Sequence, residues 1–336
     1  MRILVTGGAG YIGTHTLVSL LSKEHEICVV DNYANSSPIA LDRVRRLTNH
    51  DFEQHELDIG DGPKLSGVFA EFQPETVVHF AGLKAVGESE RDPLLYYQEN
   101  VSGAISLLKA MDASNCRQIV FSSSATVYGE PSYLPYDEKH PLAPINTYGR
   151  TKFFIEEIIR DWTKTADDKK AILLRYFNPV GAHSSGDIGE DPDGIPNNLL
   201  PFIAQVAVGR REHLNIFGDD YDTRDGTGIR DYIHVSDLAD GHAAALTYFA
   251  KMSGVEIFNL GTGNGISVLE MVEAYKKASG RDISYNIAPR RDGDVSASFA
   301  DANKAKKLLG WSANHTLDDI CRDSWSWQSK NPEGYK

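Results

Sequence analysis

The chain has 336 residues, with 34 Lys and Arg against 47 Asp and Glu, so its formal net charge is −13. Its 41% share of hydrophobic residues is too high for a disordered chain, and its length suffices for two domains with buried cores. The sequence has neither the clustered Lys and Arg that nucleic-acid binding needs nor the apolar run of about 20 residues that a membrane span needs, so we expect no nucleic-acid partner and no membrane partner.

Short apolar runs alternate with helical patterns in the first half of the chain. Arg2–Thr6 and Ile27–Asp31 are predicted strands, and Tyr11–Ser22 between them has apolar residues at helical spacing. The pattern continues with predicted strands at Thr76–Ala81, Gln118–Ser123 and Ala171–Tyr176 and predicted helices at Val101–Met111 and Thr151–Trp162. Strands that alternate with helices pair in parallel, with helices on both faces. We therefore predict an α/β fold with a doubly wound parallel sheet of Rossmann type.

The composition changes after Asn178. Residues 179–196 are rich in Gly, Pro, Asp and Ser, which is typical of a loop. Helical patterns follow at Asn198–Val208, Ser236–Phe249 and Ser267–Ala278. We expect a first domain over residues 1–178 and a smaller mixed α/β domain over residues 179–336. The boundary is approximate, because a strand or helix of the second part can return to the first sheet.

A glycine-rich segment joins the first predicted strand to the first predicted helix. Gly7, Gly10 and Gly13 allow a tight turn and leave backbone N–H groups, at the positive end of the helix dipole, for a pyrophosphate. Three glycines can also simply build a turn. However, Asp31 ends the second strand, where a carboxylate accepts both ribose hydroxyls and repels a 2′-phosphate. No Arg occurs in residues 32–35, so we predict that the chain binds NAD rather than NADP.

Three further residues are candidates for catalysis. Tyr148 and Lys152 are one helical turn apart, and a nearby ammonium favours the phenolate that a general base needs. An ordinary surface Tyr and Lys is the alternative. Ser124 follows a predicted strand at the edge where ligands bind in such sheets, although turn chemistry explains a serine there as well. Together with the glycine segment, these residues predict a hydroxyl-oxidising site.

The three cysteines, Cys28, Cys116 and Cys321, are far apart and fit neither a metal-binding nor a redox spacing. We therefore expect a reduced, cytoplasmic protein without a metal site.

The sequence resembles the extended short-chain dehydrogenase/reductase family, and within it the UDP-glucose 4-epimerase (UDP-galactose 4-epimerase) branch. The resemblance covers nearly the whole chain and is most specific in stretches such as Val5–His15, His79–Glu88, Phe121–Gly129 and Gly226–Asp240. It implies that Tyr148 is the catalytic base, Lys152 its electrostatic partner and Ser124 a hydrogen-bond partner of the sugar.

The resemblance also implies two sets of binding residues. The NAD contacts are Gly7, Gly10, Tyr11, Ile12, Gly13, Asp31, Asn32, Asn35, Asp58, Ile59, Phe80, Ala81, Gly82, Lys84, Asn100, Ser122, Tyr148, Lys152 and Phe177. The substrate contacts are Lys84, Ser124, Tyr148, Phe177, Asn178, Asn198, Leu199, Asn215, Phe217, Arg230, Arg291, Asp294 and Ser298. Two guanidiniums suit a pyrophosphate, although either Arg alone reads as a solvated or paired surface charge, and Asn198 reads equally well as a helix N-cap.

The implied reaction is the reversible inversion of C4 in UDP-glucose and UDP-galactose, through a transient 4-keto sugar and retained NAD. A nucleotide-sugar 4,6-dehydratase is the nearest alternative, but Ala125 and Thr126 after Ser124 supply no acid/base pair for elimination. The other alternative is a non-catalytic NAD-binding protein. The small Ser298 further predicts turnover of UDP-GlcNAc and UDP-GalNAc. Members of the family are commonly homodimers, so we expect a homodimer, with Val101–Met111 and Thr151–Trp162 as candidate interface helices; packing against the sheet explains the same pattern.

Overall fold

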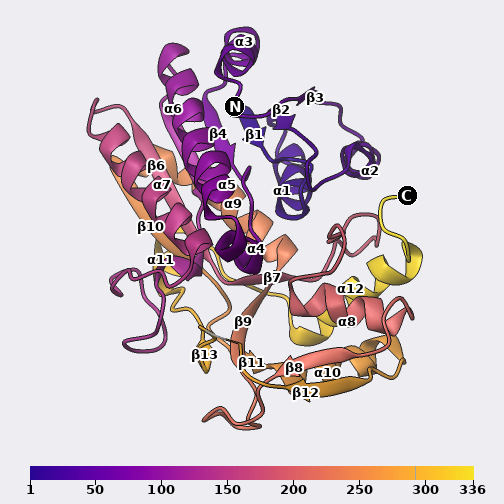
Figure 1. The fold of residues 1–336 in the computed structure, drawn as a ribbon. Helices are drawn as coiled ribbons and strands as arrows, with labels where there is room; N and C mark the ends of the chain where they lie inside the picture. The colour runs from indigo at the N-terminus through magenta and orange to yellow at the C-terminus, as the bar shows by residue number, and fades with distance from the viewer. Residues whose placement is uncertain (292) are drawn as a thin grey trace.

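The computed structural model of the protein describes residues 1–291 and 293–336. Its main feature is a seven-stranded sheet in the order β10-β6-β5-β4-β1-β2-β3, in which all neighbouring strands run parallel (Figure 1). The strands are β1 Arg2–Thr6, β2 Glu26–Asp31, β3 Glu53–Glu56, β4 Thr76–His79, β5 Gln118–Ser122, β6 Lys170–Tyr176 and β10 Gly254–Leu260. The predicted doubly wound parallel sheet is therefore confirmed.

Helices cover both faces of this sheet, as the alternating pattern predicts. One face packs its apolar side chains against helices α1 Tyr11–Leu21, α2 Pro38–Thr48, α9 Val235–Tyr248 and α11 Asn303–Leu309. The other face packs against α3 Gly62–Phe72, α6 Gly103–Ala113 and α7 Thr147–Thr163. The central strands β1, β4 and β5 are almost wholly buried, which explains their continuous apolar runs.

Short helical segments surround the carboxyl end of β4. They are α4 Val86–Arg91, α5 Pro93–Tyr96, the π-helix η1 Tyr97–Ser102 and, after β5, the 3₁₀ turn η2 Ala125–Val127. The predicted strand Thr76–Ala81 ends two residues early because the N–H groups of Phe80 and Ala81 both donate to the Thr6 carbonyl. The predicted helix Thr151–Trp162 begins four residues early, at Thr147, because the Asn146 side chain caps it.

A smaller lobe lies below the sheet in Figure 1. In its four-stranded sheet, strand β9 Ile229–His234 pairs with β7 Asn178–Val180, β11 Gly265–Ser267 and β13 Ala297–Ser298. Strands β8 Leu214–Phe217 and β12 Tyr285–Ala288 form a separate pair. Its helices are α8 Leu199–Ala207, α10 Val268–Ser279 and α12 Leu317–Lys330, which share an apolar core; the 3₁₀ turn η3 Phe249–Lys251 follows α9. A capping box of Ser267 and Glu270 begins α10.

The chain passes between the two parts more than once. It leaves the sheet after β6, enters the lobe with β7, and returns through α9 and β10, which pairs with β6. Because the strands are parallel, their carboxyl ends share one edge, and the β6–β7 connection shows that this edge faces the lobe. None of the helices in the described part of the chain is long and apolar enough to span a bilayer.

Candidate active site

The glycine-rich turn between β1 and α1 is packed too closely for side chains. Gly7 has φ +70°, and a Cβ there would lie 2.6 Å from the Ala81 nitrogen. A Cβ on Gly13 would lie 2.4 Å from the Gly7 carbonyl oxygen. Helix α1 begins after Gly10 with neither a side-chain cap nor an acidic residue in its first turn. The first N–H groups of this helix are therefore available to an anion.

Asp31 lies at the carboxyl end of β2, as expected, and contacts this turn. Its Oδ2 accepts the Ala9 N–H at 2.9 Å, and its Oδ1 accepts the Tyr33 N–H at 2.9 Å. Asn32 donates to the Asp58 carboxylate at 2.7 Å, which joins two of the predicted adenosine-side residues. Ile59 is buried beside them and Asn35 is exposed.

Asn100 connects the loop after β4 to α7. Its Oδ1 accepts the Leu83 N–H at 2.7 Å, and its Nδ2 donates to the Leu83 carbonyl at 3.0 Å and to Thr151 Oγ1 at 3.1 Å. The loop passes so close that a Cβ on Gly82 would lie 2.9 Å from Asn100 Oδ1. Phe80, Ala81 and Gly82 follow β4 at the sheet edge. The Asn100 contacts therefore place this loop next to α7, the helix that carries Tyr148.

Tyr148 and Lys152 are buried in the first turns of α7, with 7% and 5% of their surfaces exposed. Lys152 Nζ donates to the Ser122 carbonyl at 2.9 Å and lies 5.9 Å from the centre of the Tyr148 ring. Ser124 is equally buried and is the N-cap of η2, where its Oγ accepts the Thr126 N–H at 3.2 Å; it lies close enough to Tyr148 to lower the pKa of the phenol. The reading of Tyr148 and Lys152 as ordinary surface residues is therefore wrong, and the three predicted residues lie together.

Burial disfavours charge on both members of this pair. It raises the pKa of Tyr148 well above the usual value, an effect that the nearby Ser124 hydroxyl opposes. It also lowers the pKa of Lys152 to about 8, which the charge of Glu156 opposes. The phenol of Tyr148 therefore keeps its proton at neutral pH in the protein alone.

A buried ion pair behind the site was not predicted from the sequence. Glu156, one turn after Lys152, binds the guanidinium of Arg175 through contacts of 2.9 and 2.5 Å and accepts the Ser123 hydroxyl at 2.6 Å. It ties α7 to β6 and β5. The spacing of Lys152 and Glu156 on one helix face was the available signal, but its partner Arg175 is 19 residues away.

The predicted substrate residues form separate pairs in the lobe. Arg230, on β9, contacts the Asp294 carboxylate at 3.2 Å, and its register partner on β13 is Ser298. The Arg291 guanidinium lies 3.8 Å from the centre of the Phe217 ring. Asn215 is exposed on β8, two residues before Phe217. Arg230 is thus a paired charge, as the alternative reading expects, and Arg291 is exposed and lies against an aromatic ring.

Glu190 joins residues of the two parts of the molecule, and sequence reasoning missed it. Its carboxylate accepts Lys84 Nζ at 3.1 Å and the Asn198 amide at 3.0 Å. Asn198 holds the N-cap position before Leu199, but its side chain makes no cap hydrogen bond. Phe177, between β6 and β7, is buried, whereas Asn178 is exposed.

A doubly wound parallel sheet with a glycine-rich first turn and a buried Tyr–Lys pair defines the short-chain dehydrogenase/reductase class. A family model described as GDP-mannose 4,6 dehydratase matches residues 4–324. UDP-glucose 4-epimerases of Bacillus subtilis (strain 168) and Homo sapiens are 56% and 54% identical, over 100% and 99% of this chain and 99% and 98% of their own lengths. A crystal structure of UDP-glucose 4-epimerase from Bifidobacterium longum in complex with NAD+ and UDP shares 52% identity and a TM-score of 0.96, covering 99% of this chain and 100% of that chain. The chain belongs to the UDP-glucose 4-epimerase family of extended short-chain dehydrogenases/reductases.

Proposed function

We propose that this protein inverts C4 of UDP-glucose and UDP-galactose reversibly, with NAD as a retained cofactor. The observation that carries the proposal is the buried Tyr148–Lys152 pair at the carboxyl edge of the sheet, beside Ser124. The names of the full-length relatives support the substrate, and they do not favour the dehydratase alternative. A non-catalytic role would leave the burial of two ionisable side chains, at a cost in desolvation, without a purpose.

The residues of the first domain fit NAD. The glycine turn has no room for a Cβ at Gly7 or Gly13, and the uncapped start of α1 suits the pyrophosphate. Asp31 offers a carboxylate at the position of the adenosine ribose, and residues 32–35 contain no cation for a 2′-phosphate. The remaining expected contacts are the loop residues Phe80 to Lys84, together with Asp58, Ile59, Asn100, Ser122 and Phe177.

When bound, NAD accepts hydride from the sugar carbon and later returns it. The chain's own residues move the proton and hold the sugar. In the proposed step Tyr148 acts as the phenolate: its Oη takes the proton of the C4 hydroxyl and becomes the neutral phenol, and it gives this proton back when hydride returns. The Lys152 ammonium stabilises the phenolate before the first transfer and after the second. Ser124 holds the same sugar oxygen through its hydroxyl. Lys152 is positioned for this by its hydrogen bond to the Ser122 carbonyl.

The lobe supplies the residues that bind UDP. Arg230 and Arg291 offer two guanidiniums for the pyrophosphate, and Asp294 accepts from a ribose hydroxyl. Asn178, Asn198, Leu199, Asn215 and Phe217 complete this set. A firm hold on the nucleotide and a loose hold on the hexose let the oxidised sugar turn and present its other face.

Incubation of the purified protein with UDP-galactose tests the proposal. We expect UDP-glucose as the product, without added NAD. A 4-keto-6-deoxy product would instead show a dehydratase, and unchanged UDP-galactose in a protein that retains NAD would show a non-catalytic binder.

Ser298 supports turnover of the 2-acetamido sugars as well. It is a small, half-buried residue on β13, and its register partner on β9 is Arg230, one of the proposed UDP-binding residues. We expect interconversion of UDP-GlcNAc and UDP-GalNAc, and loss of only this activity in Ser298→Tyr. Turnover restricted to UDP-glucose and UDP-galactose in the unmodified protein would contradict this expectation.

An exposed apolar surface supports a homodimer. Leu94 of α5, Ile105 of α6 and Phe154 of α7 are 79%, 37% and 43% exposed on neighbouring helices of one face. Exposed apolar side chains on neighbouring helices are typical of protein interfaces. Sedimentation should show a dimer that Leu94→Asp combined with Phe154→Asp dissociates, whereas Ile287→Asp, at an exposed apolar position on β12, should not.

The fold also supports a division of the chain into two functional parts. Residues 1–178, completed by the returning α9, β10 and α11, form the NAD-binding part, and the rest of 179–336 forms the nucleotide-sugar part. The three cysteines are buried and unpaired, which supports a cytoplasmic location.

A further inference from the structure

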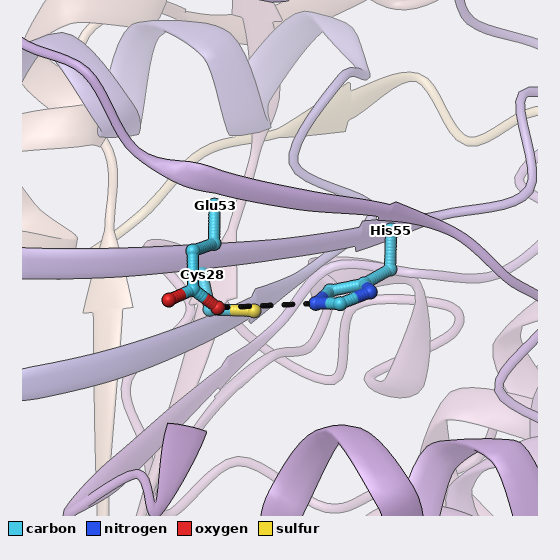
Figure 2. Close-up of side chains that lie close together, drawn as sticks. All are labelled: Cys28, Glu53 and His55. Atoms are coloured by element: carbon cyan, nitrogen blue, oxygen red, sulfur yellow. Dashed lines mark ion pairs between the residues drawn. The ribbon is translucent and has the colours of Figure 1, made fainter. Parts of the chain in front are cut away.

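Three potential metal ligands lie together on strands β2 and β3, at the edge of the large sheet. In the parallel register, Cys28 is the partner of Glu53, and Val30 is the partner of His55. Paired residues of neighbouring strands point to the same face, so Cys28, Glu53 and His55 share one face. Figure 2 shows their side chains converging, with a dashed line between Glu53 and His55. One ligand atom of each residue lies within 4.8 Å of the other two.

The chemistry of these three atoms selects the metal. A thiolate sulfur, an imidazole nitrogen and a carboxylate oxygen are the ligand types of Zn²⁺, whereas Mg²⁺ and Ca²⁺ take oxygen ligands almost exclusively. Tetrahedral zinc places its ligand atoms about 3.5 Å apart. The cluster therefore has to contract by roughly an ångström.

Two of the three side chains are free to make this movement. The side chains of Glu53 and His55 are 60% and 32% exposed, and the Glu53 carboxylate already lies 3.9 Å from His55 Nε2. Cys28 is fully buried and provides the fixed ligand. We propose that Cys28, Glu53 and His55 bind one Zn²⁺ ion, with water in the fourth position. On binding, the S–H bond of Cys28 breaks, an S–Zn bond forms and the proton goes to solvent, with no change of oxidation state.

The position of the site suggests a structural purpose. Strand β3 has four residues and is paired on one side only, because it ends the sheet. A metal bound to residues of both β2 and β3 would link this edge strand covalently to its neighbour. Asp58 and Ile59, the proposed adenine contacts, follow His55 within four residues. The ion would thereby hold the adenine end of the proposed NAD site in place.

Spacing in the sequence gives no sign of this site, because Cys28 is 25 residues before Glu53. Only the pairing of β2 with β3 brings the ligands together.

Cobalt substitution in the full-length, untagged protein tests the proposal. After treatment with a chelator, we expect one Co²⁺ per chain and the near-ultraviolet charge-transfer band of a thiolate–cobalt bond. Zn²⁺ should displace the cobalt and raise the midpoint of thermal unfolding. His55→Ala and Glu53→Gln, at partly exposed positions where folding is safe, should weaken binding at least tenfold, and Cys28→Ser should abolish the band.

Matched variants define the control. Cys116→Ser removes another buried thiol, and His50→Ala removes an exposed imidazole of the same region outside the cluster; both should bind cobalt as the unmodified protein does. Cobalt binding without the charge-transfer band, or equal binding by His55→Ala and the unmodified protein, would overturn the proposal. The readout needs no enzymatic activity, so failure here leaves the proposed reaction untouched.

Discussion

At the scale of single residues, burial shifts the pKa values of both Tyr148 and Lys152 toward their neutral forms. The phenol of Tyr148 is harder to ionise than usual, and the ammonium of Lys152 is easier to neutralise. In the proposed reaction, this hydroxyl exchanges its proton with the sugar hydroxyl rather than with solvent, because only 7% of the Tyr148 surface is exposed. The Ser124 hydroxyl opposes this effect of burial on Tyr148, and in the proposed reaction the Lys152 ammonium also favours the phenolate.

Replacing the Tyr148 hydroxyl should therefore remove proton transfer while keeping the fold. We expect Tyr148→Phe to lower kcat for UDP-galactose by about 10²–10⁴, the usual contribution of a general base. Retained NAD and the midpoint of thermal unfolding should change little. Tyr133→Phe is the control, since that hydroxyl contacts Asp137 on the surface. Full activity of Tyr148→Phe would refute the assignment of the base.

At the scale of elements, the position of α7 depends on a contact that lies behind the reactive pair. Glu156 and Arg175 are 0% and 1% exposed, so neither charge has water as an alternative partner. Removing one member of a buried pair leaves the other uncompensated, which costs about 3–5 kcal/mol.

We expect Glu156→Gln to lower the free energy of unfolding by about that amount. Urea unfolding measures it. The matched control is Glu157→Gln on the same helix, because Glu157 is 51% exposed and its pair with Arg160 is worth little. Equal effects of the two substitutions would show that the buried pair does not hold α7 to the sheet.

The turn before α1 depends on glycine at a position where packing forbids a side chain. Gly13→Ala places a Cβ against backbone atoms of Gly7 and Gly8, which cannot move as a flexible side chain would. We expect a loss of about 1–3 kcal/mol in stability and a fall in copurified NAD.

Gly67→Ala, in the middle of α3, provides the contrast for this substitution. A Cβ on Gly67 meets no atom within 4 Å, so we expect a gain of up to about 1 kcal/mol from helix propensity. Nucleotide release on denaturation and thermal unfolding measure both variants. Undiminished NAD in Gly13→Ala would contradict the role of this turn.

Local patterns predicted most of the sheet and its covering helices because burial on both faces produces continuous apolar runs. Arg2–Thr6 is confirmed to the residue, and Ala171–Tyr176 differs by one. Strand β3 was missed because its sequence, Glu-Gln-His-Glu, is polar and only its pairing with β2 makes it a strand. The Lys84–Glu190–Asn198 contact was missed because its members are up to 114 residues apart and meet only through the tertiary fold.

At the scale of the whole molecule, the interior of the large sheet and its covering helices contains buried polar groups as well as apolar ones. Three of these groups are histidines that the folded protein keeps neutral. Burial lowers the pKa of His15 and His79 to about 3 and that of His242 to about 4. His15 lies on α1, His79 at the end of β4 and His242 on α9, so they span the interior of the sheet and its helices.

These histidines should make the protein sensitive to acid. In the unfolded chain they bind protons below pH 6.5, whereas in the folded chain they do not until about pH 3–4. The stability that they contribute is complete above pH 6.5 and is lost as the pH falls through this window. Each should steepen the fall of the unfolding free energy by up to about 1.4 kcal/mol per pH unit.

Urea unfolding between pH 4 and pH 7 should show this slope, and one substitution should reduce it. His242→Phe keeps the ring against Phe80 and removes the titrating group, so the slope should become shallower by about 1.4 kcal/mol per pH unit at the cost of one hydrogen bond to the Leu238 carbonyl. His50→Phe, at an exposed position, should leave the slope unchanged. An equal slope in His242→Phe and the unmodified protein would show that this imidazole becomes protonated without unfolding the chain.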